Sequence, residues 1–297
     1  MQPTYYGYEE KCIKQMITLP PQHQPWHPGL EWMMEPRPIY DDAAYIGSNK
    51  LQGKVAIITG GDSGIGRAVS IAFAKEGADV VIVYLYEDRD AMETKQVVEQ
   101  YGVRCLLIRG DLRESSFSKE IVKKTLAKFG SINILVNNAA VQYPKPSILE
   151  ISDEQLENTF RTNIFSYFYL TKAVLPHLTC HDTIINTASI TAYNGFKNLI
   201  DYSSTKGAIV SFTRSLSLSL IDQKIRVNAV APGPIWTPLI PSSFSAEEVK
   251  TFGADTNMKR PGQPFELAPA YVYLASNDSS YVSGQVIHVN GGEMVSS

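Results

Sequence analysis

The sequence predicts an α/β fold built on a single doubly wound parallel sheet of seven strands, with helices on both faces. Two observations predict this fold. From Gly53 onward, short runs rich in β-branched residues alternate with longer stretches of helical periodicity, which is typical of βαβ units. A glycine-rich turn also follows the first of these runs and leads directly into a helical pattern. We therefore expect one domain over residues 51–297.

The expected elements follow one another in order along that domain. The strands are VAIIT (55–59), VVIVYL (80–85), RCLLI (104–108), NILVN (133–137), TIINTA (183–188), RVNAV (226–230) and QVIHV (285–289). Helices are expected to begin near Gly64, Asp88, Ser115, Ser152 and Asp201. Gly77 and Gly130 are expected to end helices, because glycine readily takes the left-handed conformation at a helix C-terminus.

Residues 1–50 differ from the domain and form an expected N-terminal arm rich in proline. Prolines at positions 3, 20, 21, 25, 28, 36 and 38 interrupt any long helix or strand. The arm also contains Trp26, Trp32 and the pair Met33-Met34. Because a solvated tail rarely carries such side chains, we expect the arm to pack on the main domain or on a neighbouring subunit, the alternative being a disordered tail.

Composition excludes several classes of function. Lys and Arg number 27 against 30 Asp and Glu, so nothing in the charge favours a nucleic acid or an anionic membrane as partner. No apolar stretch has the length of a membrane span, and the N-terminus lacks the pattern of a secretory signal. The three cysteines, Cys12, Cys105 and Cys180, are too few for a disulfide framework. We therefore expect a cytoplasmic protein.

A phosphate-binding turn is predicted directly after the first strand, in the sequence TGGDSGIGR at 59–67. Glycines at 60, 64 and 66 allow a sharp turn and a close approach of the backbone to a pyrophosphate. The helix that follows offers free N–H groups and the positive end of its dipole. The alternative is a tight turn without a ligand. The position of this turn between the first strand and its helix favours nucleotide binding.

Tyr202 and Lys206 stand four residues apart at the start of an expected long helix, so both project from one face. They could form a proton-transfer pair, or be a tyrosine that anchors the helix beside a solvated lysine. The two residues alone favour the second interpretation, because this spacing is common by chance. The remaining motifs reverse that preference.

Residues 51–297 contain the motifs TGxxxGIG and YxxxK, which occur together in one known protein family. The segment resembles the short-chain dehydrogenase/reductase family, in its glucose/ribitol dehydrogenase-like subgroup of general stress oxidoreductases. The resemblance implies a Rossmann fold, bound NAD or NADP, and hydride transfer between nicotinamide and a small alcohol or carbonyl compound. It also implies a homotetramer, with interfaces formed by the helices near 152 and 201 and by the last strand.

The resemblance also assigns roles to individual residues. Tyr202 would be the general acid or base, and Lys206 would lower the pKa of Tyr202 and bind the nicotinamide ribose. Ser189 would donate a hydrogen bond to the substrate oxygen, and Asn163 would hold a water that links Lys206 to solvent. Asp111 would meet the adenine amino group. The implied cofactor residues are Gly60, Asp62, Ser63, Gly64, Ile65, Gly66, Tyr84, Asp111, Leu112, Asn138, Ala139, Ala140, Tyr202, Lys206, Pro232, Gly233, Ile235 and Thr237. Ala140 stands where the family has glycine, which places a methyl group near the expected cofactor ribose.

The choice of nicotinamide is argued from charge beside the adenine ribose. The glycine loop supplies Asp62 and Ser63, and Arg89 is the one cation soon after the second strand, so we favour NAD over NADP. The carboxylate that would bind a ribose directly at the strand end is also missing. We expect no metal, because the residues His177, Cys180 and His181 fit an exposed polar turn better than a metal site.

The segment 235–262 is expected to form a lid over the substrate, because it joins the sixth strand to the last helix. Its apolar residues include Trp236, Leu239, Ile240 and Phe244. A small aldehyde, a ketone and a sugar or polyol all fit this composition.

Two other functions are alternatives to this oxidoreductase. One is a catalytically silent protein that senses nicotinamide, and the other is an epimerase or dehydratase. The four intact catalytic positions disfavour the first, and the TGxxxGIG motif with the short C-terminal region disfavours the second.

Overall fold

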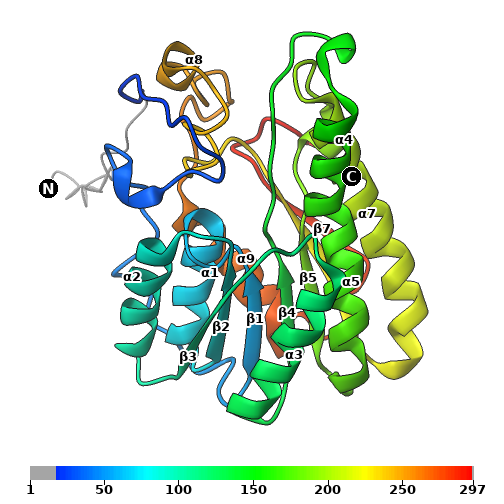
Figure 1. Ribbon diagram of the computed structural model, residues 1–297. Helices are drawn as coiled ribbons and strands as arrows, with labels where there is room; N and C mark the ends of the chain where they lie inside the picture. The colour runs from blue at the N-terminus through cyan, green and yellow to red at the C-terminus, as the bar shows by residue number, and fades with distance from the viewer. Residues whose placement is uncertain (1–17, 296–297) are drawn as a thin grey trace, which may run out of the picture.

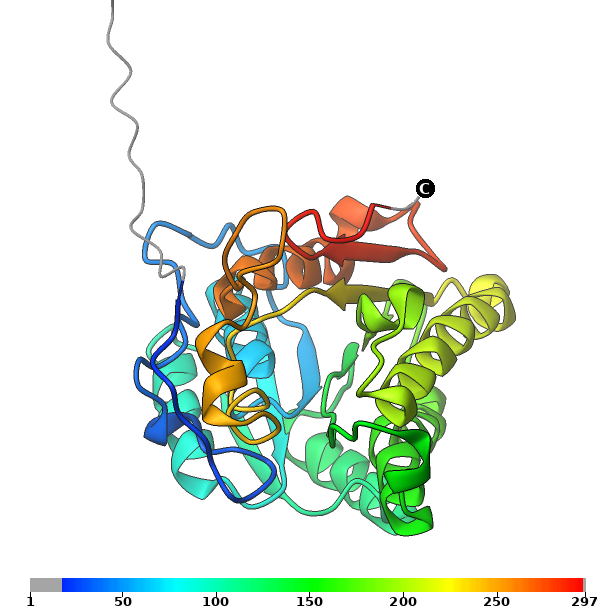
Figure 2. The same ribbon diagram turned by 90° about the horizontal axis from the view of Figure 1, so that it is seen from above.

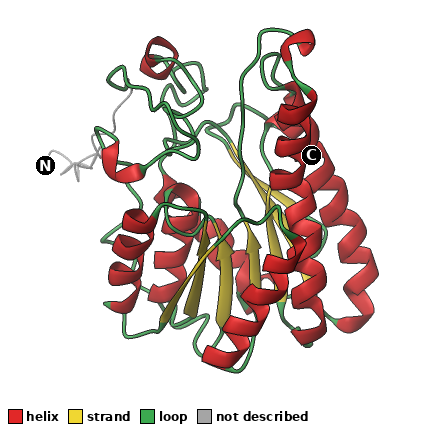
Figure 3. Ribbon diagram, viewed as in Figure 1, coloured by secondary structure: helices red, strands yellow, loops and turns green. Residues whose placement is uncertain are grey.

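The computed structural model describes residues 18–295 and contains the expected doubly wound sheet (Figures 1 and 3). Residues 1–17, with Cys12, and residues 296–297 lie outside the described part. All strand pairs are parallel, in the order β3-β2-β1-β4-β5-β6-β7. The strands are β1 (Val55–Thr59), β2 (Asp79–Tyr84), β3 (Cys105–Arg109), β4 (Ile134–Asn137), β5 (Thr183–Thr187), β6 (Arg226–Pro232) and β7 (Val286–Val289). The direction of winding reverses between β1 and β4, which opens a crevice at their carboxyl ends.

Helices cover both faces of this sheet, as predicted. They are α1 (Gly64–Lys75), α2 (Asp88–Glu99), α3 (Ser115–Phe129), α4 (Asp153–Phe160), α5 (Ser166–Val174), α6 (Thr191–Asn194), α7 (Ile200–Leu220), α8 (Ala246–Lys250) and α9 (Ala268–Ala275). A π-helical turn, Arg161–Phe165, joins α4 to α5. Helices α1, α2 and α9 pack in one hydrophobic core, and α3, α5 and α7 contribute to the core on the opposite face.

The two cores follow from the alternation of side chains along each strand. In β1, Ala56 and Ile58 belong to the core with α1, whereas Val55 and Ile57 belong to the core with α3. Because both faces are covered, all five residues of β1 are buried. The predicted helix ends are also present, since Gly77 and Gly130 have φ angles of +88° and +84°. The sheet thus holds the ends of β1, β4 and β5 in one rigid edge.

Residues 18–50 of the arm pack against their own chain. Leu19 and Met34 are buried in a small core with Trp236, Ile240 and Val249, which lie after β6. The arm runs beside the segment that contains α8 in both views (Figures 1 and 2). The expectation of a packed arm is therefore met for these residues.

Tryptophan burial does not hold the arm in place. Trp26 and Trp32 keep 40% and 36% of their surface exposed. Trp32 lies instead under the guanidinium of Arg89, whose central carbon is 4.3 Å from the centroid of the Trp32 ring.

No helix within residues 18–295 is long and apolar enough to cross a membrane.

Candidate active site

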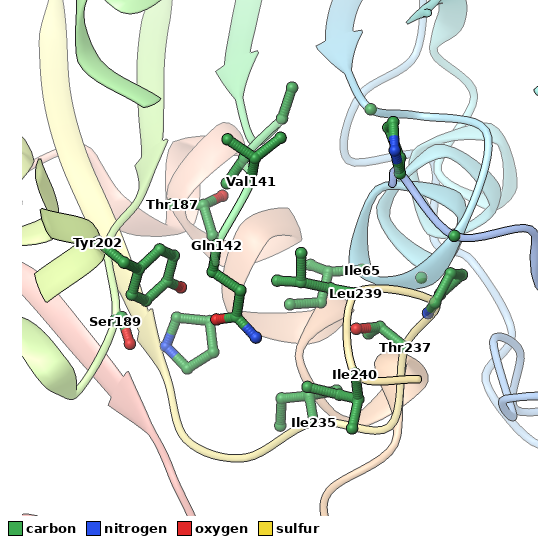
Figure 4. Close-up of a pocket in the computed structure, with 18 of the residues that line it drawn as sticks. Ile65, Val141, Gln142, Thr187, Ser189, Tyr202, Ile235, Thr237, Leu239 and Ile240 are labelled. Atoms are coloured by element: carbon green, nitrogen blue, oxygen red, sulfur yellow. The ribbon is translucent and has the colours of Figure 1, made fainter. Parts of the chain in front are cut away.

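The crevice at the carboxyl edge of the sheet holds a cavity of about 830 Å³. Residues that follow β1 through β6 line it, together with residues of the arm. Tyr202 and Ser189 lie together on one side of this cavity, Ile65 and Thr237 lie on the other, and Gln142 lies between them (Figure 4). The volume lies within the range of sites that enclose small molecules and cofactors.

The glycine loop has the backbone geometry of a phosphate cradle. Gly60 and Gly64 have φ angles of +60° and +50°, a region that side chains with a Cβ rarely adopt. A Cβ on Gly66 would lie 1.8 Å from the carbonyl oxygen of Gly60, so the helix can approach the strand only because residue 66 is glycine. Helix α1 begins at Gly64, which brings its N-terminus to the crevice. The loop therefore fits the pyrophosphate of a dinucleotide.

Asn138 joins the ends of three strands beside the glycine loop. Its backbone N–H donates to the hydroxyl of Thr59 at 2.8 Å, and its side-chain amide donates to the carbonyl of Thr59 at 3.1 Å. Its side-chain oxygen accepts a hydrogen bond from the hydroxyl of Thr187 at 3.3 Å. These bonds hold the residues after β4 in a fixed position at the floor of the cavity.

Helix α7 brings Tyr202 and Lys206 to the cavity from one face. The nitrogen of Lys206 lies 5.3 Å from the centroid of the Tyr202 ring and donates to the carbonyl of Thr187 at 2.9 Å. Both side chains are buried, with exposed fractions of 8% for Tyr202 and 1% for Lys206. Burial raises the pKa of Tyr202 to about 12, against an opposing hydrogen bond with Ser189. Burial also lowers the pKa of Lys206 to about 7.

In the chain by itself, burial and the hydrogen bond with Ser189 set the pKa of Tyr202, and the expected effect of Lys206 on that pKa stays a prediction. Removal from water penalises the phenolate of Tyr202 and the ammonium of Lys206 alike. A lysine whose charge is itself disfavoured supplies little positive potential to its neighbour. The phenol is therefore protonated at neutral pH.

Ser189 is oriented as a hydrogen-bond donor toward the cavity. Its hydroxyl oxygen accepts from the backbone N–H of Thr191 at 3.2 Å and from the hydroxyl of Thr191 at 3.1 Å. With both lone pairs occupied, the hydroxyl proton remains for another acceptor. This residue lies beside Tyr202 in the cavity (Figure 4).

Asn163 lies behind the cavity and does not line it. Its side chain exchanges two hydrogen bonds with the backbone of Val141, at 2.8 Å and 2.9 Å, and donates to the hydroxyl of Thr205 at 3.1 Å. The side-chain polar atoms of Asn163 are thus bonded to protein groups, and the water expected between Asn163 and Lys206 stays a prediction. What Asn163 does is fix the chain after β4 against α7. It belongs to the π-helical turn, a geometry often found at functional sites.

Asp111 lines the cavity and is paired with Arg113. Two nitrogens of Arg113 donate to its carboxylate at distances of 2.6 Å to 3.1 Å. Burial opposes ionisation, but the hydrogen bonds and charge of Arg113 outweigh it and lower the pKa of Asp111. The carboxylate is thus ionised and available to accept a hydrogen bond from a ligand.

Most of the other predicted residues also border the cavity. They are Gly60, Asp62, Ser63, Gly64, Ile65, Tyr84, Leu112, Asn138, Ala139, Ala140, Pro232, Gly233, Ile235 and Thr237. Gly66 lies behind the loop, where it permits the close approach to Gly60. Within the described chain, no three His, Cys, Asp or Glu residues are grouped as metal ligands.

The structure adds a carboxylate that the sequence analysis missed. Glu87 lies three residues beyond the end of β2, yet the loop folds back so that its oxygen accepts hydrogen bonds from Leu85 N–H at 3.2 Å and Tyr86 N–H at 2.8 Å. It lines the cavity beside Asp62, and both are nearly inaccessible to solvent. Burial raises the pKa of both carboxyls, and the charge of Glu87 raises that of Asp62 further. A search for a carboxylate directly at the strand end could not find this residue.

Residues of the segment expected to form the lid border the cavity, but Trp236 is not among them. Ile235, Thr237 and Ile240 line the cavity (Figure 4). Trp236 is fully buried on the other side, where its indole N–H donates to the carbonyl of Pro36 at 3.0 Å. Trp236 faces away from the cavity because the arm offers it a second apolar surface. The order of strands and helices along the sequence does not reveal this surface.

Comparison with known proteins places this geometry in a family. The Enoyl-(Acyl carrier protein) reductase family matches residues 60–293. The oxidoreductase YhxC of Bacillus subtilis is 66% identical, over 94% of this chain and 97% of that protein. The glucose and ribitol dehydrogenase of Daucus carota is 53% identical, over 93% and 97%. The chloroplastic NADPH-dependent aldehyde reductase 1 of Arabidopsis thaliana is 52% identical, over 92% and 98%.

Two solved structures share the fold. A 3-ketoacyl-(acyl-carrier-protein) reductase from Brucella melitensis, complexed with NADH, matches with a TM-score of 0.74 and 31% identity, over 82% of this chain and all of that one. A short-chain dehydrogenase from Burkholderia cenocepacia, in complex with NADP, matches with a TM-score of 0.78 and 25% identity, over 82% and 99%. The chain therefore belongs to the short-chain dehydrogenase/reductase family of oxidoreductases, among the relatives of the glucose and ribitol dehydrogenases.

Proposed function

We propose that the protein is an NAD(P)-dependent oxidoreductase that transfers a hydride between nicotinamide and a small aldehyde, ketone, or sugar or polyol. The observation that carries this proposal is the convergence of Ser189, Tyr202 and Lys206 in one cavity with the glycine loop. Family membership supports the same reaction class. Nothing in the site favours the alternative of a silent nicotinamide sensor.

The residues that would hold the cofactor extend along the crevice. The N-terminus of α1, with Ser63 and Ile65, would bind the pyrophosphate. Asp111 would accept from the adenine amino group, and Thr237, which lies beside Gly64 of the glycine loop, would meet the phosphate or the nicotinamide carboxamide. A bound nicotinamide would supply or accept the hydride.

Tyr202 would donate the proton when a carbonyl compound is reduced. Its phenol is protonated at neutral pH and buried, so a proton leaves it only toward a group that becomes more basic during the reaction. Ser189 would donate a second hydrogen bond to the same oxygen, where negative charge develops. Lys206, with a pKa of about 7, can exchange protons near neutrality and would restore the proton of Tyr202.

We propose NAD as the preferred cofactor. Glu87 and Asp62 border the cavity beside the glycine loop, and two buried carboxyls favour ribose hydroxyls over a 2′-phosphate. Arg89, the cation that the sequence places near this site, stacks on the ring of Trp32. One relative is named as NADPH-dependent. We therefore propose the preference for NAD for this chain alone and not for its relatives.

Cofactor titration coupled to a substrate panel tests the proposal. The purified protein would be mixed with NADH or NADPH and with aldehydes, sugars or quinones, and the loss of absorbance of the reduced nicotinamide would be recorded. We expect consumption with at least one small carbonyl compound, and tighter binding of NADH than of NADPH. Saturable binding without consumption across the whole panel would instead favour a nicotinamide sensor.

We further propose a cytoplasmic homotetramer in which residues 51–297 form the catalytic domain. An apolar surface on α5 and α7 supports the assembly. Phe168 and Phe212 contact each other across it, with ring centroids 4.4 Å apart, and Phe168 is 46% exposed. An aromatic patch of this kind is typical of a subunit interface.

A further inference from the structure

Residues 24–30 of the arm, which we call the strap, form a closed loop over the mouth of the crevice. The side-chain amide of Gln24 donates to the carbonyl of Leu30 at 2.9 Å and accepts from the N–H of Leu30 at 2.6 Å. These two bonds join the first and last residues of the strap. The strap is therefore a preformed loop with a fixed shape.

The strap is attached on one side to the loop after β2. The hydroxyl of Tyr86 donates to the carbonyl of Pro28 at 2.6 Å. Tyr86 itself does not line the cavity, although Leu85 and Glu87 on either side of it do. Its hydroxyl therefore acts on the strap and not directly on a ligand.

The strap is attached on the other side to the residues after β4. The N–H of Gln142 donates to Nε2 of His27 at 3.4 Å, and the rings of His27 and Tyr143 have centroids 4.9 Å apart. Burial lowers the pKa of His27 to about 4, so its ring is neutral at physiological pH and can accept this bond. Because β1 with its glycine loop lies between β2 and β4 in the sheet, the strap crosses in front of the glycine loop.

The lid forms the third attachment. The N–H of Gln24 donates to the carbonyl of Pro241 at 2.8 Å. The backbone of Gly29 lies so close to Pro238 that a Cβ at residue 29 would be 2.3 Å from the carbonyl oxygen of Pro238. The strap thus touches the loops after β2, β4 and β6, which surround the crevice.

A buried charge cluster fixes the end of the strap to the glycine loop. The carboxylate of Glu31 accepts from the N–H of Gly64 at 2.6 Å and pairs with Arg67 at 2.7 Å. Asp90 accepts from the N–H groups of Glu31 and Trp32, at 2.8 Å and 3.0 Å. Glu31, Arg67 and Asp90 are almost completely buried, so separating them leaves uncompensated charge and is costly.

We propose that the strap is the outer wall of the dinucleotide site and that the cofactor enters and leaves only when the strap lifts away from Tyr86. His27, Pro28 and Gly29 line the cavity together with the glycine loop. The charge cluster at Glu31 and the bond of Gln24 to Pro241 stay in place, while the bond from Tyr86 and the longer bond from Gln142 to His27 open. Release of the cofactor is then limited by the strap, and the proposal rests on the nicotinamide binding proposed above.

The rate of NADH release tests this proposal with two matched substitutions. Tyr86→Phe removes the hydroxyl that holds the strap and leaves the ring. Tyr45→Phe removes a tyrosine hydroxyl that bonds Glu76 at the other end of the arm. NADH fluorescence in a stopped-flow displacement by excess NAD⁺ gives the release rate, and thermal unfolding shows that each variant is folded.

We expect Tyr86→Phe to release NADH about tenfold faster than the wild type, which corresponds to the loss of one partly buried hydrogen bond. Tyr45→Phe should release it at the wild-type rate. Equal rates in all three proteins would overturn the proposal, and equal acceleration by both substitutions would replace it with a general loosening of the arm. A wild type that binds neither NADH nor NADPH would refute the proposed function as well.

Discussion

Lys206 carries its amino group into one of the least accessible places of the described chain. The side chain is 1% exposed, and its nitrogen donates to the carbonyl of Thr187 at 2.9 Å. No carboxylate is paired with it among residues 18–295. A charge at this position is therefore held by the fold at the expense of stability, as expected for a group that serves a reaction.

Lys206→Met should change how stability depends on pH. The pKa of Lys206 is about 7 in the folded chain, because burial lowers it from the ordinary lysine value of 10.5. Between these values the unfolded chain binds more protons, so the free energy of unfolding rises with pH over this window. We expect Lys206→Met to lose that rise and to be more stable than the wild type at pH 7 and below, by a few kcal/mol.

Urea unfolding at several pH values from 6 to 10 measures this effect. Lys123→Met, at an exposed position of α3, serves as the control and should keep the wild-type pH dependence. Parallel stability curves for the wild type and Lys206→Met would show that the amino group is not dehydrated in the folded chain.

Tyr202→Phe should separate turnover from cofactor binding. The phenol is the proton donor in the proposed reaction, and the ring fills a buried position that phenylalanine can keep. We expect kcat to fall by at least about 10²-fold, the usual contribution of general acid catalysis, while the Kd for NADH changes little. Single-turnover kinetics and a fluorescence titration give the two quantities, and retained turnover would remove Tyr202 from the mechanism.

Glu87→Gln should weaken the discrimination between the two nicotinamides. The amide keeps an oxygen that can accept from Leu85 N–H and Tyr86 N–H, so the loop stays folded, but one negative charge beside the ribose site is lost. We expect the ratio of Kd for NADPH to Kd for NADH to fall by about tenfold. An unchanged ratio would show that Glu87 does not face the 2′ position.

At the scale of elements, the contact between β1 and α1 depends on one missing side chain. Gly66 and Gly60 approach each other so closely that no Cβ can be accommodated at residue 66. The contact also places the N-terminus of α1 at the cavity. A displaced helix would lose both packing in the core and the orientation of its N–H groups.

Gly66→Ala should therefore destabilise the fold and weaken NADH binding together. We expect a loss of about 1–3 kcal/mol, the size associated with overpacking a rigid contact, and a Kd raised by at least about tenfold. Gly207→Ala is the matched control, because residue 207 lies in α7 and a Cβ there meets nothing within 4 Å. Alanine at that position should stabilise the helix by roughly 0.5–1 kcal/mol. Wild-type stability in Gly66→Ala would contradict the proposed packing.

At this scale, an element can be predicted from the sequence when all of its signals lie close together along the chain. The VAIIT run corresponds residue for residue to β1. Its β-branched residues mark the strand, and the glycine turn that follows directly marks where the strand ends. Strand β6 instead continues two residues beyond the RVNAV run, to Pro232. Its last four residues, 229–232, pair with β7, and this contact is not visible in a local pattern.

At the scale of the whole molecule, the site could be predicted where it depends on motifs and not where it depends on distant contacts. Asn138 and Ser189 follow strands in the expected order, and the topology of the sheet alone brings them together. His27 reaches the same cavity through contacts with residues more than 100 positions away, for which no local signal exists. The burial of Trp236 against Pro36 has the same origin.

The proposed assembly gives a prediction for the whole molecule. Phe168→Asp places a charge in the apolar surface of α5 and α7, where burial against a second subunit would be unfavourable. We expect sedimentation velocity to show a smaller species than the wild type. Met92→Asp, on α2 at the opposite face of the sheet, should leave the assembly intact. Identical sedimentation of all three proteins would place the interface elsewhere.

The small core shared by Met34 of the arm and Trp236 of the lid has a consequence for evolution and for engineering. A lid transplanted from a relative with another substrate would arrive without the partner surface that its buried face requires. The indole N–H of Trp236 would also lose its acceptor if residue 36 moved. A new lid in this chain would therefore require a matching change in the arm that packs against it.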